Sequence, residues 1–317
     1  PQDSAEAIAW YQQAAEQGHA VAEAELGALY ALGEGVPQDF AEAAKWYRRA
    51  ADQGDFFAQL QLGFLYDTGK GVPQDFTAAR KWYGKAAAQA VPAAQTLLGE
   101  LHEQGLGGPQ NLAEAFNWYR KAAENGFGPA QFALARMYSL GLGTAGNDSE
   151  AAKWLQSAAA QGLAEAQYAL GAFYNSGFGV PLTSTEAEKW FRRSAERGSP
   201  AGQKDLGFMY EIGRGVEKRL EQAAKWYSRG ALKGNAYAQA NLGVWYDTGR
   251  GVPQDHAEAA KWYRLAAEQG EHFAQTNLGV LYDKGRGVTQ NSAEAARWYK
   301  EAARQGNAKA QTNLGLL

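Results

Sequence analysis

The chain has 317 residues, no cysteine, and 31 basic against 34 acidic side chains, which give a net charge of -3 at pH 7. The missing cysteines exclude disulfides, thiolate nucleophiles and cysteine-ligated zinc. A charge so close to balance lacks the basic excess that neutralises phosphates, so no nucleic-acid partner is expected. No apolar run approaches the roughly 20 residues of a membrane-spanning helix, so no membrane insertion is expected.

Nine of the ten tryptophans recur at a constant spacing of 36 residues, and a period of this length predicts a repeat array. They are Trp10, Trp46, Trp82, Trp118, Trp154, Trp190, Trp226, Trp262 and Trp298. Because every unit of an array buries the same side chain against its neighbour, we interpret them as core residues rather than as a ligand-stacking ladder. Trp245 breaks the series and stands where other units have leucine, so we expect an enlarged core residue there.

In chain order, the sequence predicts one continuous array over residues 1–317. Residues 1–19 form a partial unit with only a second helix. The following units are 20–55, 56–91, 92–127, 128–163, 164–199, 200–235, 236–271 and 272–307, and 308–317 is a partial first helix. In residues 20–55 apolar side chains recur at helical spacing over 20–32 and again over 40–53. Each complete unit is therefore predicted to be a helical hairpin.

Capping residues and glycines mark the ends of the predicted helices. Asp39 and Glu42 suggest a capping box, in which the aspartate accepts from first-turn amides and the glutamate returns to the cap amide. Thr183 and Glu186 suggest the same in a later unit. Gly27, in mid-helix, recurs in every later unit but one, although glycine weakens a helix by about 1 kcal/mol relative to alanine. We therefore expect an aromatic ring of the second helix to lie against it.

Residues 236–270 read A-x-A-Q-x-x-L-G-x-x-Y-x-x-G-x-G-V-P-Q-D-x-x-x-A-x-K-W-Y-x-x-A-A-x-x-G, and the other units follow this pattern closely. The pattern resembles the Sel1-like repeat, a relative of the tetratricopeptide repeat. The resemblance implies an all-α fold, a right-handed α-solenoid (superhelix) of about nine 36-residue helix-turn-helix repeats. It also implies that first helices line a concave surface and that the surface binds proteins. Departures are local: Thr144 to Gly146 replace the V-P-Q turn, and His102 replaces a tyrosine.

No residue pattern indicates an active site, a cofactor site or a metal site. The four histidines lie in different units and do not converge, and the G-x-G stretches follow helices rather than strands, as turn glycines do. Most carboxylates have structural explanations. Four acids lie four residues after an arginine on the second helices, which predicts ion pairs. The pairs are Arg48 with Asp52, Arg120 with Glu124, Arg192 with Glu196, and Arg264 with Glu268.

Positions that differ between units are free of the common packing constraint, so a partner-binding surface is expected among them. Two such rows lie on the first helices, one directly after the mid-helix glycine and one three residues before it. Residues i and i+4 share a helix face, so the rows form one stripe. Its candidate site residues are Leu60, Phe64, Glu100, Phe132, Arg136, Tyr168, Lys204 and Phe208. The alternative is that Phe64, Phe132 and Phe208 fill gaps between adjacent first helices.

The favoured function is a non-catalytic scaffold or adaptor that binds a peptide segment or helix of a partner protein in its concave groove, with no cofactor. The aromatic residues of the stripe would anchor the partner, and its charged residues would select it. Two alternatives stay open. The first is a β-lactam-binding or hydrolysing enzyme, because some cysteine-bearing relatives that the chain resembles have been linked to penicillin binding or slow β-lactam hydrolysis. A structural spacer or oligomerisation module, associating through its uncapped ends, is the other.

The residues leave the compartment open, and only the resemblance bears on it. It favours the bacterial periplasm or secretion, where many bacterial proteins of this type act, while eukaryotic relatives work in the endoplasmic reticulum. The chain starts at Pro1, inside a predicted hairpin, and stops at Leu317 within a first helix. We therefore expect a piece of a longer protein, from which any signal peptide would be absent.

Overall fold

The computed structural model describes residues 2–317, with side chains described from Glu6 onward. Within that range the chain forms α-helices and no strand. The helices are α1 (Gln2–Glu16), α2 (Ala20–Leu32), α3 (Phe40–Asp52), α4 (Phe56–Thr68), α5 (Phe76–Ala88), α6 (Pro92–Gln104), α7 (Leu112–Glu124), α8 (Gly128–Leu140), α9 (Asp148–Ala160), α10 (Ala164–Ser176), α11 (Ser184–Glu196), α12 (Pro200–Ile212), α13 (Leu220–Leu232), α14 (Ala236–Thr248), α15 (His256–Glu268), α16 (His272–Lys284), α17 (Ser292–Arg304) and α18 (Ala308–Leu316).

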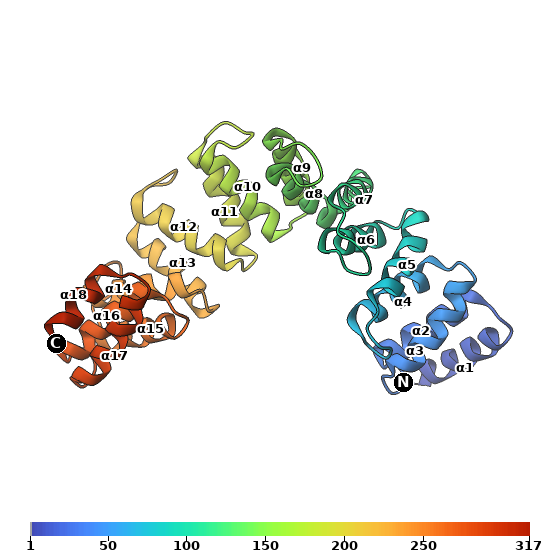
Figure 1. Cartoon of the computed structure of the whole chain (residues 1–317), viewed down its shortest axis with the longest axis horizontal. Helices are drawn as coiled ribbons and strands as arrows, with labels where there is room; N and C mark the ends of the chain where they lie inside the picture. The colour runs from blue at the N-terminus through green and yellow to red at the C-terminus, as the bar shows by residue number, and fades with distance from the viewer. Residues whose placement is uncertain (1) are drawn as a thin grey trace. The chain divides into compact units, whose positions relative to one another are not determined.

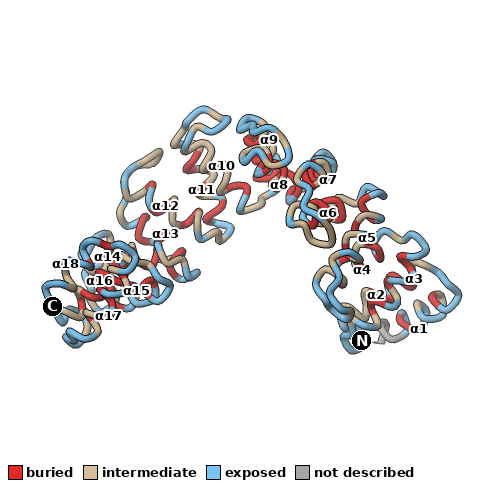
Figure 2. Tube along the Cα trace, in the orientation of Figure 1, coloured by how far each residue is buried: buried red, intermediate tan, exposed pale blue. Residues whose placement is uncertain are grey.

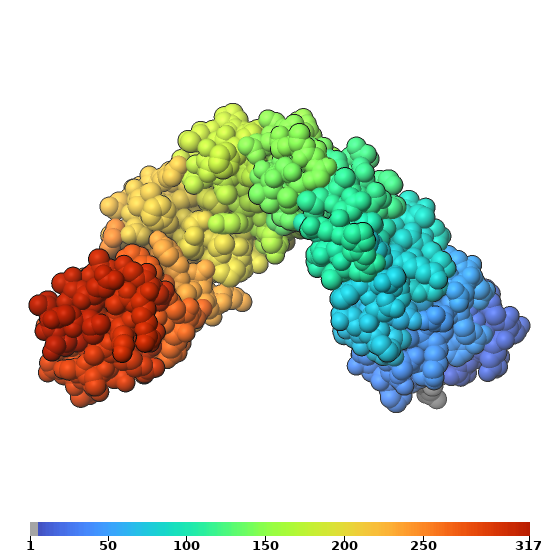
Figure 3. All heavy atoms as spheres, viewed as in Figure 1, coloured from blue at the N-terminus to red at the C-terminus, as the bar shows by residue number. Residues whose placement is uncertain are grey.

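The helices group into two compact units, an N-terminal unit (Pro1–Gln161) and a C-terminal unit (Gly162–Leu317). Within each unit every helix contacts the helix before it and the helix after it in the chain (Figure 1). Space-filling atoms show successive repeats of one unit as adjoining bands of colour (Figure 3). Even-numbered helices are the predicted first helices and odd-numbered helices the second. The predicted hairpins and the all-α repeat solenoid are confirmed.

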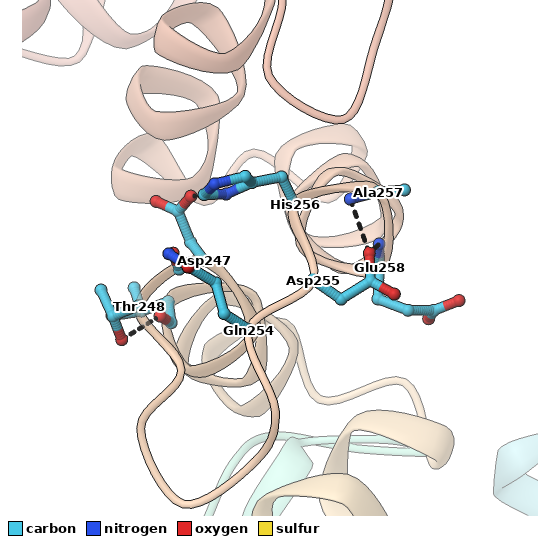
Figure 4. Close-up of polar contacts among 8 residues, drawn as sticks. Asp247, Thr248, Gln254, Asp255, His256, Ala257 and Glu258 are labelled. Carbon is cyan, nitrogen blue, oxygen red and sulfur yellow. Dashed lines mark hydrogen bonds and ion pairs between the residues drawn. The ribbon is translucent and has the colours of Figure 1, made fainter.

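Most turns between the two helices of a repeat are held by polar contacts that the repeated sequence supplies. In the repeat of α14 and α15, the Gln254 side chain donates to the Asp247 carbonyl oxygen at 2.7 Å. The Asp255 carboxylate accepts from the amides of Ala257 and Glu258, at 2.9 and 3.0 Å (Figure 4). These bonds satisfy amides that the start of a helix otherwise leaves without partners.

The glutamate half of the predicted capping box is wrong. The Asp39 amide donates to the Tyr30 carbonyl oxygen at 2.9 Å, so it is not available to Glu42. The Glu42 carboxylate instead pairs with Lys45 at 2.9 Å. The predicted box at Thr183 is also wrong, because its hydroxyl donates to the Pro181 carbonyl oxygen rather than accepting from the helix.

Most of the recurring tryptophans join each repeat to the core of the repeat before it. Trp82, on α5, is 4% exposed and packs into the cluster that Ala43 and Tyr47 of α3 form with Leu62 of α4. Equivalent residues on later helices pack in the same way, and buried residues gather where helices face one another (Figure 2). Trp10, by contrast, is exposed. The core interpretation is confirmed for the packed members of the series.

Trp245 is almost completely buried and contacts the Tyr227 ring edge-on, with ring centroids 5.4 Å apart. An edge-to-face aromatic pair adds about 0.5–1.5 kcal/mol beyond the area it buries. The enlarged core residue predicted there is confirmed.

The mid-helix glycines lie against aromatic rings of the second helices, as predicted. A Cβ atom added to Gly63 would stand 2.5 Å from a ring carbon of Tyr83, closer than packed atoms approach. The same contact recurs between Gly171 and Phe191 at 2.7 Å. The repeat with alanine at the glycine position, Ala135, has Leu155 in place of the ring, and both residues are buried. Alanine therefore appears where the second helix supplies no ring.

This contact predicts an unusual sign for a glycine-to-alanine substitution in a helix. Helix propensity alone predicts that Gly63→Ala raises the free energy of unfolding by about 1 kcal/mol. Because the added methyl group would overlap the Tyr83 ring, we expect urea unfolding to show instead a decrease of about 1–3 kcal/mol.

The double variant Gly63→Ala/Tyr83→Leu, which copies the Ala135 and Leu155 pair, serves as the control. It should lose less than the two single variants together, with a coupling energy of about 1 kcal/mol or more. Additive losses would show that the ring and the glycine do not constrain each other.

Buried glutamine side chains bind each first helix to the repeat before it and to the end of the second helix of its own repeat. Gln59, on α4, donates to the Ala51 carbonyl oxygen at 3.1 Å and accepts from Gln89 at 2.9 Å. Gln131, Gln239 and Gln275 each make the same two kinds of bond. Where the residue equivalent to Gln89 is Asn125 or Lys233, the buried Oε1 atoms of Gln95 and Gln203 have no hydrogen-bond partner among the described residues.

A longer amide at position 125 should supply the missing donor. Because Asn125 is one methylene shorter than the glutamines of other repeats, we expect Asn125→Gln to stabilise the fold by about 1 kcal/mol in urea unfolding. The reverse change, Gln89→Asn, should destabilise it by a similar amount. An unchanged midpoint for both variants would contradict this account of the glutamine bonds.

Candidate functional site

The first helices approach one another more closely than the second helices do within each unit. Helix α2 contacts α4 and α6 contacts α8 in the N-terminal unit, and α14 contacts α16 in the C-terminal unit. We call the solvent-facing side of the even-numbered helices the first-helix face. It carries all eight candidate site residues, five in the N-terminal unit and three in the C-terminal unit.

In the N-terminal unit the two rows of the stripe differ in exposure. Phe64, Glu100 and Arg136, which follow the glycine position, are exposed. Leu60 and Phe132, three residues before it, are half-buried. Leu60 packs against the core cluster of α5 and α6. The row after the glycine position therefore offers most of the surface that a partner can reach.

In the C-terminal unit the stripe is a polar network beside an exposed ring. The Tyr168 hydroxyl donates to Asp205 Oδ2 at 2.9 Å, and Lys204 Nζ lies 2.9 Å from Asp205 Oδ1. Burial and the Asp205 carboxylate raise the pKa of Tyr168 to about 12. The Tyr168 ring packs against core residue Phe191. Phe208, one helical turn after Lys204, is 41% exposed.

Tyrosine hydroxyls of the second helices reach carboxylates on the first helices. Tyr119 donates to Glu103 Oε2 at 2.9 Å, and Arg136 Nη2 lies 2.6 Å from the same oxygen. Tyr83 and Tyr227 donate in the same way to Asp67 and Glu211. Where the second helix has Leu155 or Phe191 and no hydroxyl, the first helix has Ser139 or Asn175 and no acid. Many acids of this face are therefore hydrogen-bond acceptors for tyrosine.

Glu100 is different, because it makes no hydrogen bond or ion pair within the described part of the chain. Loss of water contact and the negative charges of Asp67 and Glu103 raise its pKa, although Arg136 opposes the shift. The groups that face it and affect its charge come from α4, α6 and α8. Glu100 is thus an exposed carboxylate in an environment with surplus negative charge.

A further row of apolar side chains on the first-helix face was not predicted from the sequence. Phe57, Tyr237 and Phe273 occupy the second position of their helices and are 38%, 49% and 62% exposed. Lys204 Nζ lies 5.4 Å from the centre of the Tyr237 ring, close enough for a cation–π contact. The sequence signal for this row is the variation between units at the second position of each first helix.

Three of the four predicted arginine ion pairs are wrong. Only Arg120 approaches its predicted partner, Glu124, at 3.9 Å. The other three arginines donate instead to a tyrosine hydroxyl of the following repeat. The donors and acceptors are Arg48 to Tyr66, Arg192 to Tyr210, and Arg264 to Tyr282. These side chains join neighbouring repeats, and Arg192 also pairs with Glu188 on its own helix.

His102 replaces the tyrosine of this arginine contact in one repeat. Its Nδ1 atom hydrogen-bonds with Arg80 Nη2. The usual arginine position is Gly84 in this repeat, and Arg80 lies one helical turn before it. Burial, and then the charge of Arg80, lower the pKa of His102. The folded protein therefore binds a proton at His102 less readily than the unfolded chain does.

This shift predicts that the free energy of unfolding decreases as the pH falls below about 6.5, the ordinary pKa of histidine. The variant His102→Tyr restores the common residue and removes the effect. We expect its urea midpoint to change less than that of the unmodified chain between pH 7.5 and 5. Parallel pH profiles for the two proteins would contradict the prediction.

Neither a metal-binding cluster nor a membrane-spanning helix is found among the described residues. No group of three or more histidine, aspartate or glutamate side chains within residues 2–317 is arranged to hold a metal ion. None of the described helices combines the length and apolar character needed to cross a membrane.

The helical hairpins, the 36-residue period and the two faces define an all-α repeat solenoid. A family model described as Sel1 repeat matches nine segments of the sequence. They are residues 1–19, 20–55, 57–91, 92–127, 128–163, 164–199, 200–235, 236–271 and 272–307. The chain belongs to the Sel1 repeat family, whose members are typically non-catalytic scaffolds for protein interaction.

Two solved structures of Sel1-type proteins are similar to the chain over nearly all of its length. One is c5321, a protective antigen of uropathogenic Escherichia coli with an SLR fold, at 39% identity and a TM-score of 0.90. The match covers 98% of this chain and 66% of the E. coli protein, so the chain spans less than two thirds of that relative. The other is a Sel1 repeat protein from Oxalobacter formigenes, at 34% identity and a TM-score of 0.76, with 98% and 89% covered. A search of the curated proteins gave no match.

Proposed function

We propose that the chain is a non-catalytic scaffold whose first-helix faces bind a peptide segment or a helix of a partner protein in a concave groove. The repeats would act as one continuous array in sequence over residues 1–317. The observation that carries the proposal is the set of exposed aromatic side chains on these faces, where the repeat pattern does not require them.

The support comes from differences between repeats. Phe64 and Phe208 are exposed, although the equivalent positions of other repeats hold alanine or valine without loss of the fold. Folding alone gives no reason for a large ring there. Protein interfaces are enriched in aromatic side chains and arginine, and charged side chains beside them add specificity. Arg136 and Lys204 are placed to do this.

Leu60, Phe132 and Tyr168 contribute less surface. They are half-buried, and we propose that they shape the floor of the groove, while the exposed row makes most of the contact. The closer approach of the first helices within each unit favours this side as the inner one.

The experiment uses the full chain and a phage-displayed library of random 12-residue peptides as the probe. Recovered peptides are synthesised with a fluorescent label, and their affinity is measured by anisotropy. We expect Phe64→Ala/Phe208→Ala to weaken binding by about 10-fold or more, because removing an aromatic anchor from an interface typically costs 1–2 kcal/mol or more. Circular dichroism should show unchanged helix content.

Phe178→Ala is the matched control, because Phe178 is a phenylalanine that is at least as exposed as Phe64 and Phe208 and lies in a turn outside the first-helix face. It should bind as the unmodified chain does. Failure to recover any peptide above a chain-free surface, or equal affinity for all three proteins, would overturn the groove proposal.

A further inference from the structure

The two units carry opposite net charge although the whole chain is nearly balanced. Residues 1–161 contain 18 acidic and 11 basic side chains, a charge of -7, whereas residues 162–317 contain 16 acidic and 20 basic, a charge of +4. Charge of one sign over half of a chain favours partners of the opposite sign.

The negative charge of the N-terminal unit includes its first helices. Helices α2, α4, α6 and α8 bear the acids Glu23, Glu25, Asp67, Glu100 and Glu103, and the single base Arg136. Arg136 is already paired with Glu103. Glu23 is buried and pairs with Arg49 from α3. The remaining surface charge of this face therefore has no cationic partner on the same helices.

Two of these acids are open to a partner. Glu25 and Glu100 are exposed, and neither makes a hydrogen bond or ion pair with any described residue. Partial loss of water, and then repulsion from Asp67 and Glu103, raise the pKa of Glu100. A cation brought by a ligand would relieve that repulsion.

Apolar side chains lie on the helix between these two acids. Phe57 and Phe64 of α4 are each 38% exposed. Among the first helices, α4 comes between α2, which carries Glu25, and α6, which carries Glu100. The base nearest these rings, Lys70, has its Nζ atom 5.6 Å from the Phe64 ring centre and 5.4 Å from that of Phe40. The face thus alternates carboxylates with aromatic surface across three helices.

We infer that the first-helix face of the N-terminal unit binds a segment of another protein in which lysine or arginine side chains flank a bulky apolar residue. This inference rests on the proposed function and specifies the partner's chemistry. The carboxylates attract the cations, and the exposed rings pack against the apolar residue and the aliphatic stems of lysine and arginine. No three described acids or histidines of this face are grouped to hold a metal ion, and a nucleic acid would be repelled by the negative charge.

The test compares the composition of library peptides recovered on the chain and their response to charge removal. We expect recovered peptides to be enriched in lysine and arginine and depleted in aspartate and glutamate relative to the starting library. Glu25→Gln/Glu100→Gln should weaken their binding about 3- to 10-fold at low salt, because exposed charge pairs at an interface contribute only a modest binding free energy. The difference between the two proteins should shrink at 0.5 M salt.

Glu124→Gln is the control, because Glu124 is an exposed acid of the same unit on the second helix α7. It should leave peptide affinity unchanged. An equal loss in this variant would show that net charge alone, rather than the first-helix face, attracts the peptides.

Titration gives a second readout. An ordinary glutamate has a pKa of about 4.3. Because the pKa of Glu100 is raised, its carboxylate is neutralised at a higher pH than that of an ordinary glutamate. Binding should therefore begin to weaken at a higher pH in the unmodified chain than in Glu100→Gln. Tyr83 and Tyr119, which lie near Glu100, have pKa values raised well above this range and stay neutral throughout.

The outcomes separate this inference from the proposed function. Peptides that lose affinity in Phe64→Ala/Phe208→Ala but show no cationic bias, or that ignore Glu25→Gln/Glu100→Gln, would overturn the charge inference and leave the groove intact. Recovery of no peptide at all would overturn both. Enrichment of acidic peptides, or of sequences that match this chain, would point to a different occupant and would also overturn the inference.

Discussion

The contact between a glycine of the first helix and a ring of the second determines how closely the two helices of most repeats can pack. It requires the absence of a side chain at Gly63 and its equivalents and the presence of Tyr83 or Phe191 opposite. Glycine weakens the helix, so the ring contact must compensate for a cost of about 1 kcal/mol in each repeat. The pair Ala135 and Leu155 obeys the same rule with smaller partners, which shows that the requirement is steric rather than chemical.

The same contact explains the polar chemistry of the first-helix face. A tyrosine that lies across the glycine carries its hydroxyl to the end of the first helix, where Asp67, Glu103 and Glu211 accept a hydrogen bond from it. These acids are therefore part of the packing arrangement. Glu25 and Glu100 are not, because they lack such a bond. Distinguishing the two kinds of carboxylate separates residues that maintain the fold from residues that are available to a partner.

Features that recur in most units could be predicted from the sequence, because a repeated constraint leaves a repeated residue. The hairpins, the glycine and ring contact and the buried Trp245 belong to this group. Contacts decided by a neighbouring repeat could not. The spacing of Arg48 and Asp52 describes one helix, whereas Tyr66 of the next repeat is the actual partner. The exposure of the stripe was also only partly predictable. Leu60 and Phe64 share a helix face, yet Leu60 packs against the core of α5 and α6 whereas Phe64 is exposed. Helical spacing does not resolve that difference.

The glutamine bonds bear on how tightly the repeats act together. In a linear array the stability is approximately a sum of the stability of each repeat and of the interfaces between neighbours, so a bond lost within one repeat weakens that repeat first. Here the bond between the two helices of one repeat is made at Gln59 and Gln239 but is missing at Gln95 and Gln203. Gln95 and Gln203 still donate to a carbonyl oxygen of the repeat before them, so the boundary itself keeps its bond. Amide exchange would sense these two repeats as less protected than their neighbours. A surface built on repeats of unequal stability can open locally at the weaker ones while the others stay folded.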